Sequence, residues 1–139
     1  MKKYKIGFVQ GVFDMFHVGH LNILERAKEN CDYLIVGVNS DKLVEEYKNK
    51  KTIIPCDERM RIIKALRCVD EVIEMHDRDK VKVCTEHNIN AIFMGDDWKG
   101  SDFYNKMEVE LKKYNVDIVY FPYTRGTSST VLREKLLAR

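Results

Sequence analysis

The sequence predicts an α/β fold with one doubly wound, mostly parallel five-stranded sheet and helices on both faces. Short apolar runs typical of strands alternate along the chain with segments of helical spacing. Polar, glycine-containing loops come directly after several of the apolar runs. A chain of 139 residues, 45% of them hydrophobic, is enough for one core of ordinary size. We therefore expect a single domain over residues 1–139.

The predicted strands are short, nearly unbroken runs of β-branched, aromatic or aliphatic residues. They are Tyr4 to Val9, Tyr33 to Val38, Glu71 to Glu74, Ala91 to Met94 and Val116 to Phe121. The run from Glu71 is the weakest of the set. Continuous apolar runs of this kind suit strands that are buried on both faces of a parallel sheet.

The predicted helices repeat their apolar residues at helical spacing. They cover Leu21 to Ala27, Met60 to Leu66, Val81 to His87, Phe103 to Tyr114 and Val131 to Leu137. Because parallel strands joined by helices cross over with the right hand, this order predicts a Rossmann-like arrangement. Ligands of such sheets bind at the carboxyl ends of the strands, so we expect the functional residues in the loops that follow strands.

Composition excludes several function classes. The chain has 24 Lys+Arg against 22 Asp+Glu, and a net charge of +2 gives no strong field for a nucleic acid. The chain contains no apolar run of ~18 residues, the length needed to span a membrane. Its first residues are too polar for a signal peptide, so we expect a cytoplasmic protein. The four cysteines form no C-x-x-C pair, which predicts reduced thiols rather than a metal site.

The loop after the first strand contains two histidines but neither common phosphate-binding glycine motif. Without G-x-G-x-x-G or G-x-x-x-x-G-K-[ST], a dehydrogenase or a P-loop kinase is disfavoured. Instead, His17-Val18-Gly19-His20 opens a helix. Two imidazoles three residues apart can project to one side of a helix start, where free N–H groups and the helix dipole favour an anion. Gly19 allows a phosphate to approach the backbone. The alternative is a pair of surface histidines at a helix cap.

A second turn, Gly126-Thr127-Ser128-Ser129-Thr130, also follows a strand and opens a helix. Its hydroxyls and helix N-terminal amides could hold a second part of the same anion. Taken alone, it could equally be the N-cap of the last helix. Together the two turns predict that two helix starts converge on one polyphosphate and neutralise it.

Three motifs in this order give the chain a resemblance to a known family. They are the run Gly11 to His20, the loop Gly95-Asp96-Asp97-Trp98-Lys99-Gly100 and the turn Gly126 to Thr130. The chain resembles the cytidylyltransferase family of the HxGH nucleotidyltransferase superfamily, above all the members that act on glycerol 3-phosphate. The resemblance implies transfer of CMP from CTP to a small phosphorylated alcohol by direct in-line displacement, with release of pyrophosphate. It also implies Mg²⁺ on the triphosphate, without a dedicated metal site, and a homodimer.

The resemblance assigns roles to individual residues. It implies catalytic roles for His17, His20, Lys50 and Arg125. It implies nucleotide contacts for Val12, Phe13, Gly19, Arg67, Asp97, Trp98, Tyr123, Thr124, Gly126, Thr127, Ser128, Ser129 and Thr130. It implies contacts with the phosphorylated alcohol for Asp14, Lys48, Arg59 and Lys80.

Two positions depart from the family pattern, and two other functions stay open. Val12 stands where a hydroxyl residue is usual, and Tyr123 replaces an arginine, with Arg125 two residues later. These departures concern the alcohol more than the reaction, so phosphocholine, phosphoethanolamine or another polyol phosphate are alternative acceptors. An adenylyltransferase that uses ATP is the rival enzyme, although Gly95-Asp96-Asp97-Trp98 favours CTP. A non-catalytic nucleotide-binding domain is the third hypothesis. The presence of both His17 and His20 disfavours it.

Overall fold

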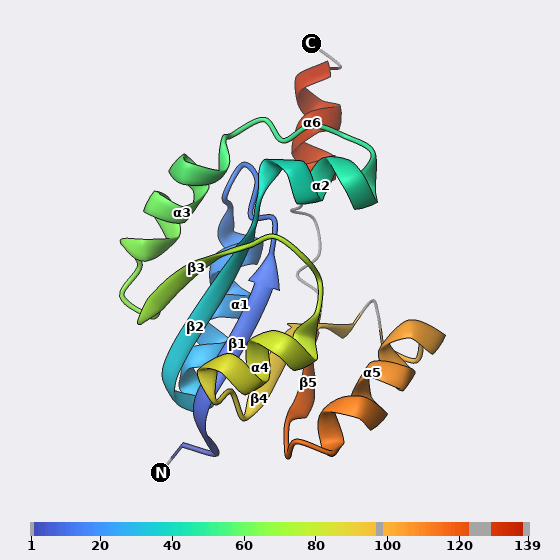
Figure 1. The fold of residues 1–139 in the computed structure, drawn as a ribbon. Coiled ribbons are helices and arrows are strands. Elements are labelled where there is room, and N and C mark those ends of the chain that lie inside the picture. Colours follow the sequence, from blue (N-terminus) through green and yellow to red (C-terminus); the bar gives the residue numbers. More distant parts are fainter. Residues whose placement is uncertain (1, 97–98, 123–128, 138–139) are drawn as a thin grey trace.

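The computed structural model of the chain describes residues 2–96, 99–122 and 129–137. Its strands form one five-stranded sheet in the order β3-β2-β1-β4-β5, and each pair of neighbours is parallel (Figure 1). The strands are β1 (Tyr4–Gly11), β2 (Cys31–Asn39), β3 (Glu71–Met75), β4 (Ala91–Gly95) and β5 (Asp117–Phe121). The predicted doubly wound sheet is confirmed.

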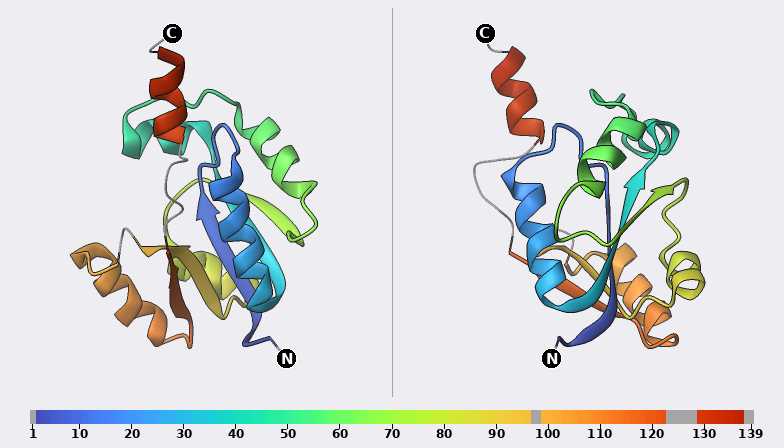
Figure 2. Two further views of the ribbon diagram at one scale, coloured as in Figure 1. Left: turned by 180° about the vertical axis from the view of Figure 1, so that it is seen from behind. Right: turned by 90° about the vertical axis from the view of Figure 1, so that its left-hand side faces the viewer.

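Helices cover both faces of this sheet, as predicted. They are α1 (Val18–Glu29), α2 (Asp41–Lys48), α3 (Cys56–Lys64), α4 (Lys80–His87), α5 (Asp102–Lys112) and α6 (Ser129–Leu137). Successive residues of a strand point to opposite faces. Accordingly, Val9 of β1 packs in one core with Leu24 of α1, whereas Phe8 packs in a second core with Leu111 of α5. Figure 2 shows α1 on one side of the sheet and α4 and α5 on the other.

The helix α2 is absent from the predictions made from sequence. Its N-cap is Ser40, whose Oγ accepts a hydrogen bond from the amide of Leu43 at 3.1 Å. Leu43 and Val44 are buried, and the helix ends at Asn49, which has a left-handed φ of 52°. A serine before a short apolar pair is a recognised start signal and could have revealed this helix.

The carboxyl ends of the strands form the edge on which α2 and the start of α6 lie (Figures 1 and 2). From β1 the chain winds outward through β2 and β3 and then returns to add β4 and β5 on the other side. The strand order therefore reverses at β1 and β4, and a crevice at that point is where this fold binds ligands. In the described residues, no helix is both long and apolar enough to cross a membrane.

Candidate active site

Buried polar side chains gather at the carboxyl edge of the sheet. Among the described residues they are Asp14, Asn39, Ser40, Arg59 and Lys80. Four of them end β2 or follow β1, β2 or β3 along the chain, and the fifth, Arg59, donates hydrogen bonds to the backbone there. Burying a polar group costs free energy unless it is satisfied, so their concentration at one edge indicates a functional site.

The loop between β1 and α1 has a strained backbone that supports the histidines. Phe13 and Met15 have φ angles of 56° and 48°, a region that side chains other than glycine rarely occupy. The buried Phe13 ring lies edge-on to His20, with 5.4 Å between ring centroids. A Cβ atom on Gly11 would lie 3.1 Å from the Phe13 ring, so the glycine leaves room for it. The conformation of the loop thus packs the Phe13 ring against His20.

Asp14 ties this loop to the segment before α3. Its Oδ2 accepts from the amide of Ile53 at 2.8 Å, and its Oδ1 accepts from the amides of Ile54 at 2.9 Å and Met15 at 3.1 Å. The side chain was expected to contact the alcohol substrate. The structure places it at 3% exposure against three backbone amides, so it also shapes the edge.

Arg59 ties together the segments that surround the site. Its Nη1 donates to the carbonyls of Val12 at 2.7 Å and Asn39 at 2.9 Å. Its Nη2 donates to Asp41 Oδ1 at 2.6 Å, and its Nε donates to the carbonyl of Ile54 at 2.8 Å. The residue was expected to contact substrate, but at 1% exposure it holds the ends of β1 and β2 to α2 and α3.

His17 and His20 close the start of α1 with their own side chains. Nδ1 of His17, the N-cap residue, accepts from the amide of Gly19 at 3.0 Å. Nδ1 of His20 accepts from the amide of His17 at 3.3 Å. The two rings stack, with 3.8 Å between centroids and an interplanar angle of 24°. The predicted placement of both imidazoles on one side of the helix start is therefore present.

This capping fixes the tautomers of both rings. A ring nitrogen that accepts a hydrogen bond carries no proton, so the proton of each neutral ring lies on Nε2. Nε2 of His17 is buried and has no hydrogen-bond partner within the described residues. A buried, unpartnered N–H donor at a helix N-terminus suits a ligand oxygen.

Both imidazoles are neutral near pH 7. Burial lowers the pKa of His17. Burial, followed by the proximity of His17, lowers the pKa of His20 to about 4, against an opposing effect of Asp14. The sequence predicts that these rings neutralise a polyphosphate. Without a ligand, they offer hydrogen-bond donors that carry no charge.

Lys80 lies on the opposite face of β1, at the start of α4. Its Nζ donates to Oε1 of Gln10, the residue before the last of β1. Nε2 of Gln10 donates to Asn39 Oδ1 at 2.7 Å and to the carbonyl of Asp77 at 3.1 Å. Nδ2 of Asn39 donates in turn to the hydroxyl of Tyr47 at 2.9 Å. Neutral amides therefore orient a buried lysine at the sheet edge.

This lysine is placed where its positive charge is disfavoured. Burial, and then the nearby positive charge of Arg78, lower the pKa of Lys80 to about 7, against an opposing effect of Asp77. An anion beside Nζ would offset both effects. An anionic ligand at this position would therefore favour the charged form of Lys80.

The remaining predicted cations occupy different places. Lys48 ends α2, with Nζ 5.7 Å from the centroid of the Tyr47 ring, and Lys50 is exposed just beyond that helix. Lys48 is thus the last residue of the helix that lies along the carboxyl edge, and Lys50 comes two residues later. Arg67 is exposed in the turn between α3 and β3. Arg59 lies in the first half of α3, near the carboxyl edge of the sheet, whereas Arg67 comes after the end of that helix. Within one chain, Arg67 therefore lies apart from the other predicted site residues.

Several predicted residues fall outside the described part of the chain. They are Asp97, Trp98, Tyr123, Thr124, Arg125, Gly126, Thr127 and Ser128. Ser129 and Thr130 open α6, but their side chains are likewise outside the description. In both Figures 1 and 2, α6 begins at the same edge as the loop that follows β1.

Sequence reasoning gave no role to four residues that the structure draws into the site. Gln10 and Asn39 were noted only as parts of loops after strands, although they orient Lys80. Tyr47 and Arg78 carried no motif. A polar residue near the end of an otherwise apolar strand, as at Gln10, is a signal that could have marked the first.

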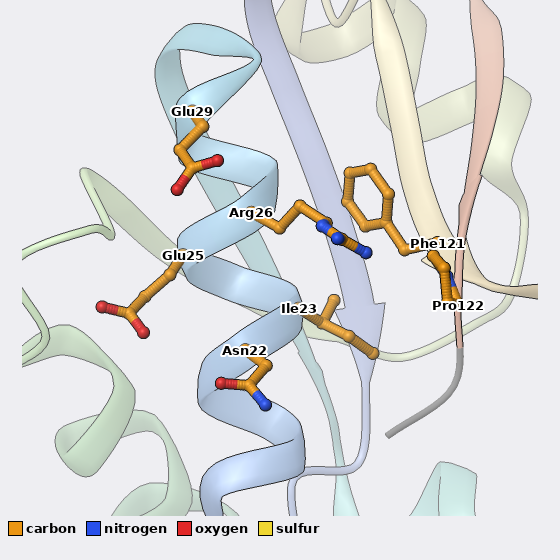
Figure 3. Close-up of a pocket in the computed structure, with 7 residues that line it drawn as sticks. All are labelled: Asn22, Ile23, Glu25, Arg26, Glu29, Phe121 and Pro122. Atoms are coloured by element: carbon orange, nitrogen blue, oxygen red, sulfur yellow. The ribbon is translucent and has the colours of Figure 1, made fainter. Parts of the chain in front are cut away.

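A separate groove of about 400 Å³ lies between α1 and the end of β5. It is lined by Asn22, Ile23, Glu25, Arg26, Glu29, Phe121 and Pro122, none of them a predicted site residue. Figure 3 shows Arg26 and Phe121 facing each other across it, with the guanidinium carbon 5.4 Å from the ring centroid. The groove lies on the α1 face, away from Lys80.

Comparisons with known proteins find related sequences over nearly the whole chain. The family model described as cytidylyltransferase-like matches residues 8–135. Glycerol-3-phosphate cytidylyltransferase of Bacillus subtilis (strain 168) is 37% identical over 127 residues, which cover 91% of this chain and 92% of that protein. FAD synthase of Thermococcus sibiricus is 38% identical over 124 residues, which cover 88% of this chain and 84% of that protein.

A solved structure extends the similarity to the fold. The crystal structure of the lipopolysaccharide core biosynthesis protein from Thermoplasma volcanium GSS1 matches with a TM-score of 0.75 and 28% sequence identity. The match covers 86% of this chain and 98% of that chain.

Proposed function

The chain belongs to the cytidylyltransferase-like family of nucleotidyltransferases, and from this premise we propose that it transfers CMP from CTP to a small phosphorylated alcohol. Glycerol 3-phosphate is the first candidate acceptor, because the Bacillus subtilis relative is named for it. The observation that carries the proposal is the imidazole pair. Two stacked rings at the start of α1 have their Nδ1 atoms engaged by backbone amides, which leaves the proton of each neutral ring on Nε2. Nε2 of His17 is buried without a hydrogen-bond partner among the described residues.

The reaction is a single displacement at phosphorus. An oxygen of the acceptor phosphate attacks the α-phosphorus of CTP and forms a new P–O bond. The bond from the α-phosphorus to the bridging oxygen breaks, and pyrophosphate leaves with the electron pair. A phosphate monoester has a second pKa of about 6, so the nucleophile is already ionised and requires no general base.

The α1 side binds the polyphosphate of CTP. The helix N-terminus favours anions, and the neutral Nε2–H groups of His17 and His20 donate to phosphate oxygens. Charge builds up on the bridging oxygen as the bond to the α-phosphorus breaks. Donors that are held in place before that moment stabilise the transition state without reorganising.

The opposite side of β1 binds the acceptor. Lys80 Nζ is fixed by Gln10 at the sheet edge, where the doubly negative acceptor phosphate would supply the missing counter-charge. The attacking oxygen then approaches from the α4 side while pyrophosphate departs toward α1. This arrangement places nucleophile and leaving group on opposite sides of the α-phosphorus, as in-line displacement requires.

Mg²⁺ enters this proposal as part of the nucleotide substrate. Within the described residues, no group of three His, Cys, Asp or Glu side chains could hold a metal ion. Both carboxylate oxygens of Asp14 accept hydrogen bonds from backbone amides. Phosphate oxygens and water are the usual ligands of Mg²⁺ on a nucleotide, and the ion offsets part of the triphosphate charge.

Adenylyl transfer from ATP is the second candidate, favoured by the 38% identity to an FAD synthase. A nucleotide panel separates the two. Purified protein is incubated with Mg²⁺, glycerol 3-phosphate and each of CTP, ATP, GTP and UTP, with pyrophosphate release and product mass as readouts. We expect CDP-glycerol from CTP and at least about 10-fold slower release with ATP, a discrimination of about 1.4 kcal/mol. Equal or faster turnover with ATP would reject the cytidylyltransferase.

We also propose a cytoplasmic location and a homodimer. Arg67 supports the second proposal, because it is an implied nucleotide ligand that lies apart from the site of its own chain. Light scattering coupled to size-exclusion chromatography measures the assembly directly. A mass of 16.4 kDa in solution would contradict the dimer.

A further inference from the structure

An arginine fills the space between two aromatic rings beside Lys80. Arg78 lies in the loop between β3 and α4. Its guanidinium carbon is 4.6 Å from the centroid of the Tyr47 ring, in α2, and 5.3 Å from that of Phe103, in α5. Both distances fall within the range of cation–π attraction. The charge of Arg78 is therefore held against two ring faces contributed by different helices.

These rings belong to the surroundings of the proposed acceptor site. The hydroxyl of Tyr47 accepts from Asn39, whose Oδ1 accepts from Gln10, and Gln10 in turn accepts from Lys80. Arg78 precedes Lys80 by two residues, and its charge is one of the causes that lower the pKa of Lys80. The guanidinium is thus close enough to act on whatever Lys80 binds.

The local charge favours some alcohols over others. The guanidinium of Arg78 and the Nζ of Lys48, 5.7 Å from the ring centroid, lie against the Tyr47 ring, and Lys80 ends the hydrogen-bond chain of that ring. The carboxylate of Asp77 lies 3.9 Å from Lys82 and partly opposes the effect of Arg78 on Lys80. An acceptor with a quaternary ammonium would bring its own cation among these charges. The aromatic faces that such a group seeks are in contact with Arg78.

We propose that Arg78 selects against phosphorylated alcohols that carry an ammonium group, so that the acceptor is a neutral polyol phosphate. This inference rests on the proposed cytidylyltransferase function. Arg78 repels the ammonium and occupies its aromatic contacts, while its positive charge attracts the acceptor phosphate. Acceptors with an ammonium group are thus disfavoured both by like-charge repulsion from Arg78 and because Arg78 already occupies the aromatic ring faces.

The test compares two acceptors in one protein preparation. The ratio of kcat/KM for glycerol 3-phosphate to that for phosphocholine is measured with CTP and Mg²⁺ for the wild type, Arg78→Ala and Arg78→Lys. Because misfolded protein lowers both values equally, the ratio reports specificity alone. Lys82→Ala is the matched control, because it removes an exposed cation of the same region that contacts neither ring.

We expect the wild type to prefer glycerol 3-phosphate by at least about 100-fold, as expected for a cation placed among like charges. Arg78→Ala should reduce the preference about 10-fold by freeing the ring faces, whereas Arg78→Lys and Lys82→Ala should keep it within about 3-fold. Equal use of both acceptors by the wild type, or an unchanged preference in Arg78→Ala, would overturn the role of Arg78 and leave the cytidylyltransferase standing. Absence of CMP transfer to any phosphorylated alcohol would remove the proposed function, and this inference with it.

Discussion

The two faces of β1 carry halves of the candidate site that are built in different ways. On the α1 face, His17 and His20 are neutral, and their Nδ1 atoms are engaged by amides of their own helix start. On the α4 face, Lys80 is a buried lysine whose hydrogen-bond acceptor is a neutral amide and whose neighbour is another cation. The donors of the first half are held in place by backbone amides, whereas in the second half the positive charge of Lys80 is disfavoured by burial and by Arg78, against an opposing effect of Asp77.

This difference assigns the two halves to different partners of the reaction. Fixed neutral donors suit a group whose charge changes during the reaction, because they stabilise the transition state without reorganisation. A buried lysine whose positive charge is disfavoured suits a ligand group that is already negatively charged when it binds. We therefore propose that the nucleotide binds in the α1 half and the acceptor phosphate in the α4 half. Changes in each half should then affect different kinetic constants.

The largest effect is expected from removing one donor of the α1 half. In His17→Asn, Oδ1 can replace Nδ1 as the helix cap, whereas nothing replaces the Nε2 donor. We expect kcat to fall by on the order of 10²-fold, with the free energy of unfolding changed by less than about 1 kcal/mol. Steady-state kinetics and thermal unfolding measure the two quantities.

His76→Asn is the control for this change. His76 has a side chain that is 71% exposed and lies 3.5 Å from Glu74, away from the start of α1. It should retain full turnover. A His17→Asn enzyme that is folded and as fast as the wild type would remove the α1 half from the mechanism.

The next effect is expected from the α4 half. Lys80→Met keeps most of the aliphatic length and removes the charge. The KM for the acceptor should rise by about 10–100-fold, because a hydrogen bond to a charged group is lost, while the KM for CTP stays within about 3-fold. Lys82→Met, at an exposed position in the same helix, should change neither constant. An equal rise in both KM values would contradict the division between the two halves.

The stability of the α1 half should depend on pH through His20. Its pKa is lowered to about 4 in the folded protein, below the ordinary 6.5, so the unfolded chain binds more protons between these values. The free energy of unfolding is therefore highest, as far as His20 is concerned, above about pH 6.5. It falls by about 1–2 kcal/mol as the pH is lowered toward 4. Urea unfolding at pH 7.5 and 4.5 measures this loss. His20→Asn should lose less, and an identical loss in both proteins would assign the effect to other groups.

The smallest effect is expected from Gln10, which orients Lys80 without touching substrate. Gln10→Leu removes the amide oxygen that accepts from Nζ. The KM for the acceptor should rise by about 3–10-fold with kcat changed less, as for the loss of one hydrogen bond. A fall in kcat at an unchanged acceptor KM would show that Gln10 does not act through Lys80.

The fold was largely predictable because its signals are local. Strands buried on both faces are continuous apolar runs, and even the weakest, at Glu71, proved to be β3. The helix α2 was missed because its eight residues are rich in charge and only Leu43 and Val44 are buried. Its start signal at Ser40 was available but was interpreted as part of a loop.

The candidate site was predictable only in part. The pairing of His17 and His20 follows from a three-residue spacing at a helix start, which is a local property. The contacts of Asp14 with Ile54 and of Lys80 with Gln10 join residues 40 and 70 positions apart. Such contacts depend on how the crossovers stack, so sequence patterns could place these residues at the edge but could not assign their partners.

The stereochemistry at phosphorus distinguishes a single displacement across β1 from two successive displacements. The enzyme is given one diastereomer of CTP with sulfur on the α-phosphorus, and the configuration of the product is determined by ³¹P NMR after stereospecific conversion. Attack from the Lys80 side, with departure toward His17 and His20, predicts inversion in a single displacement. Retention would mean two successive displacements through a covalent enzyme intermediate, and it would contradict the division of the site between the two faces of β1.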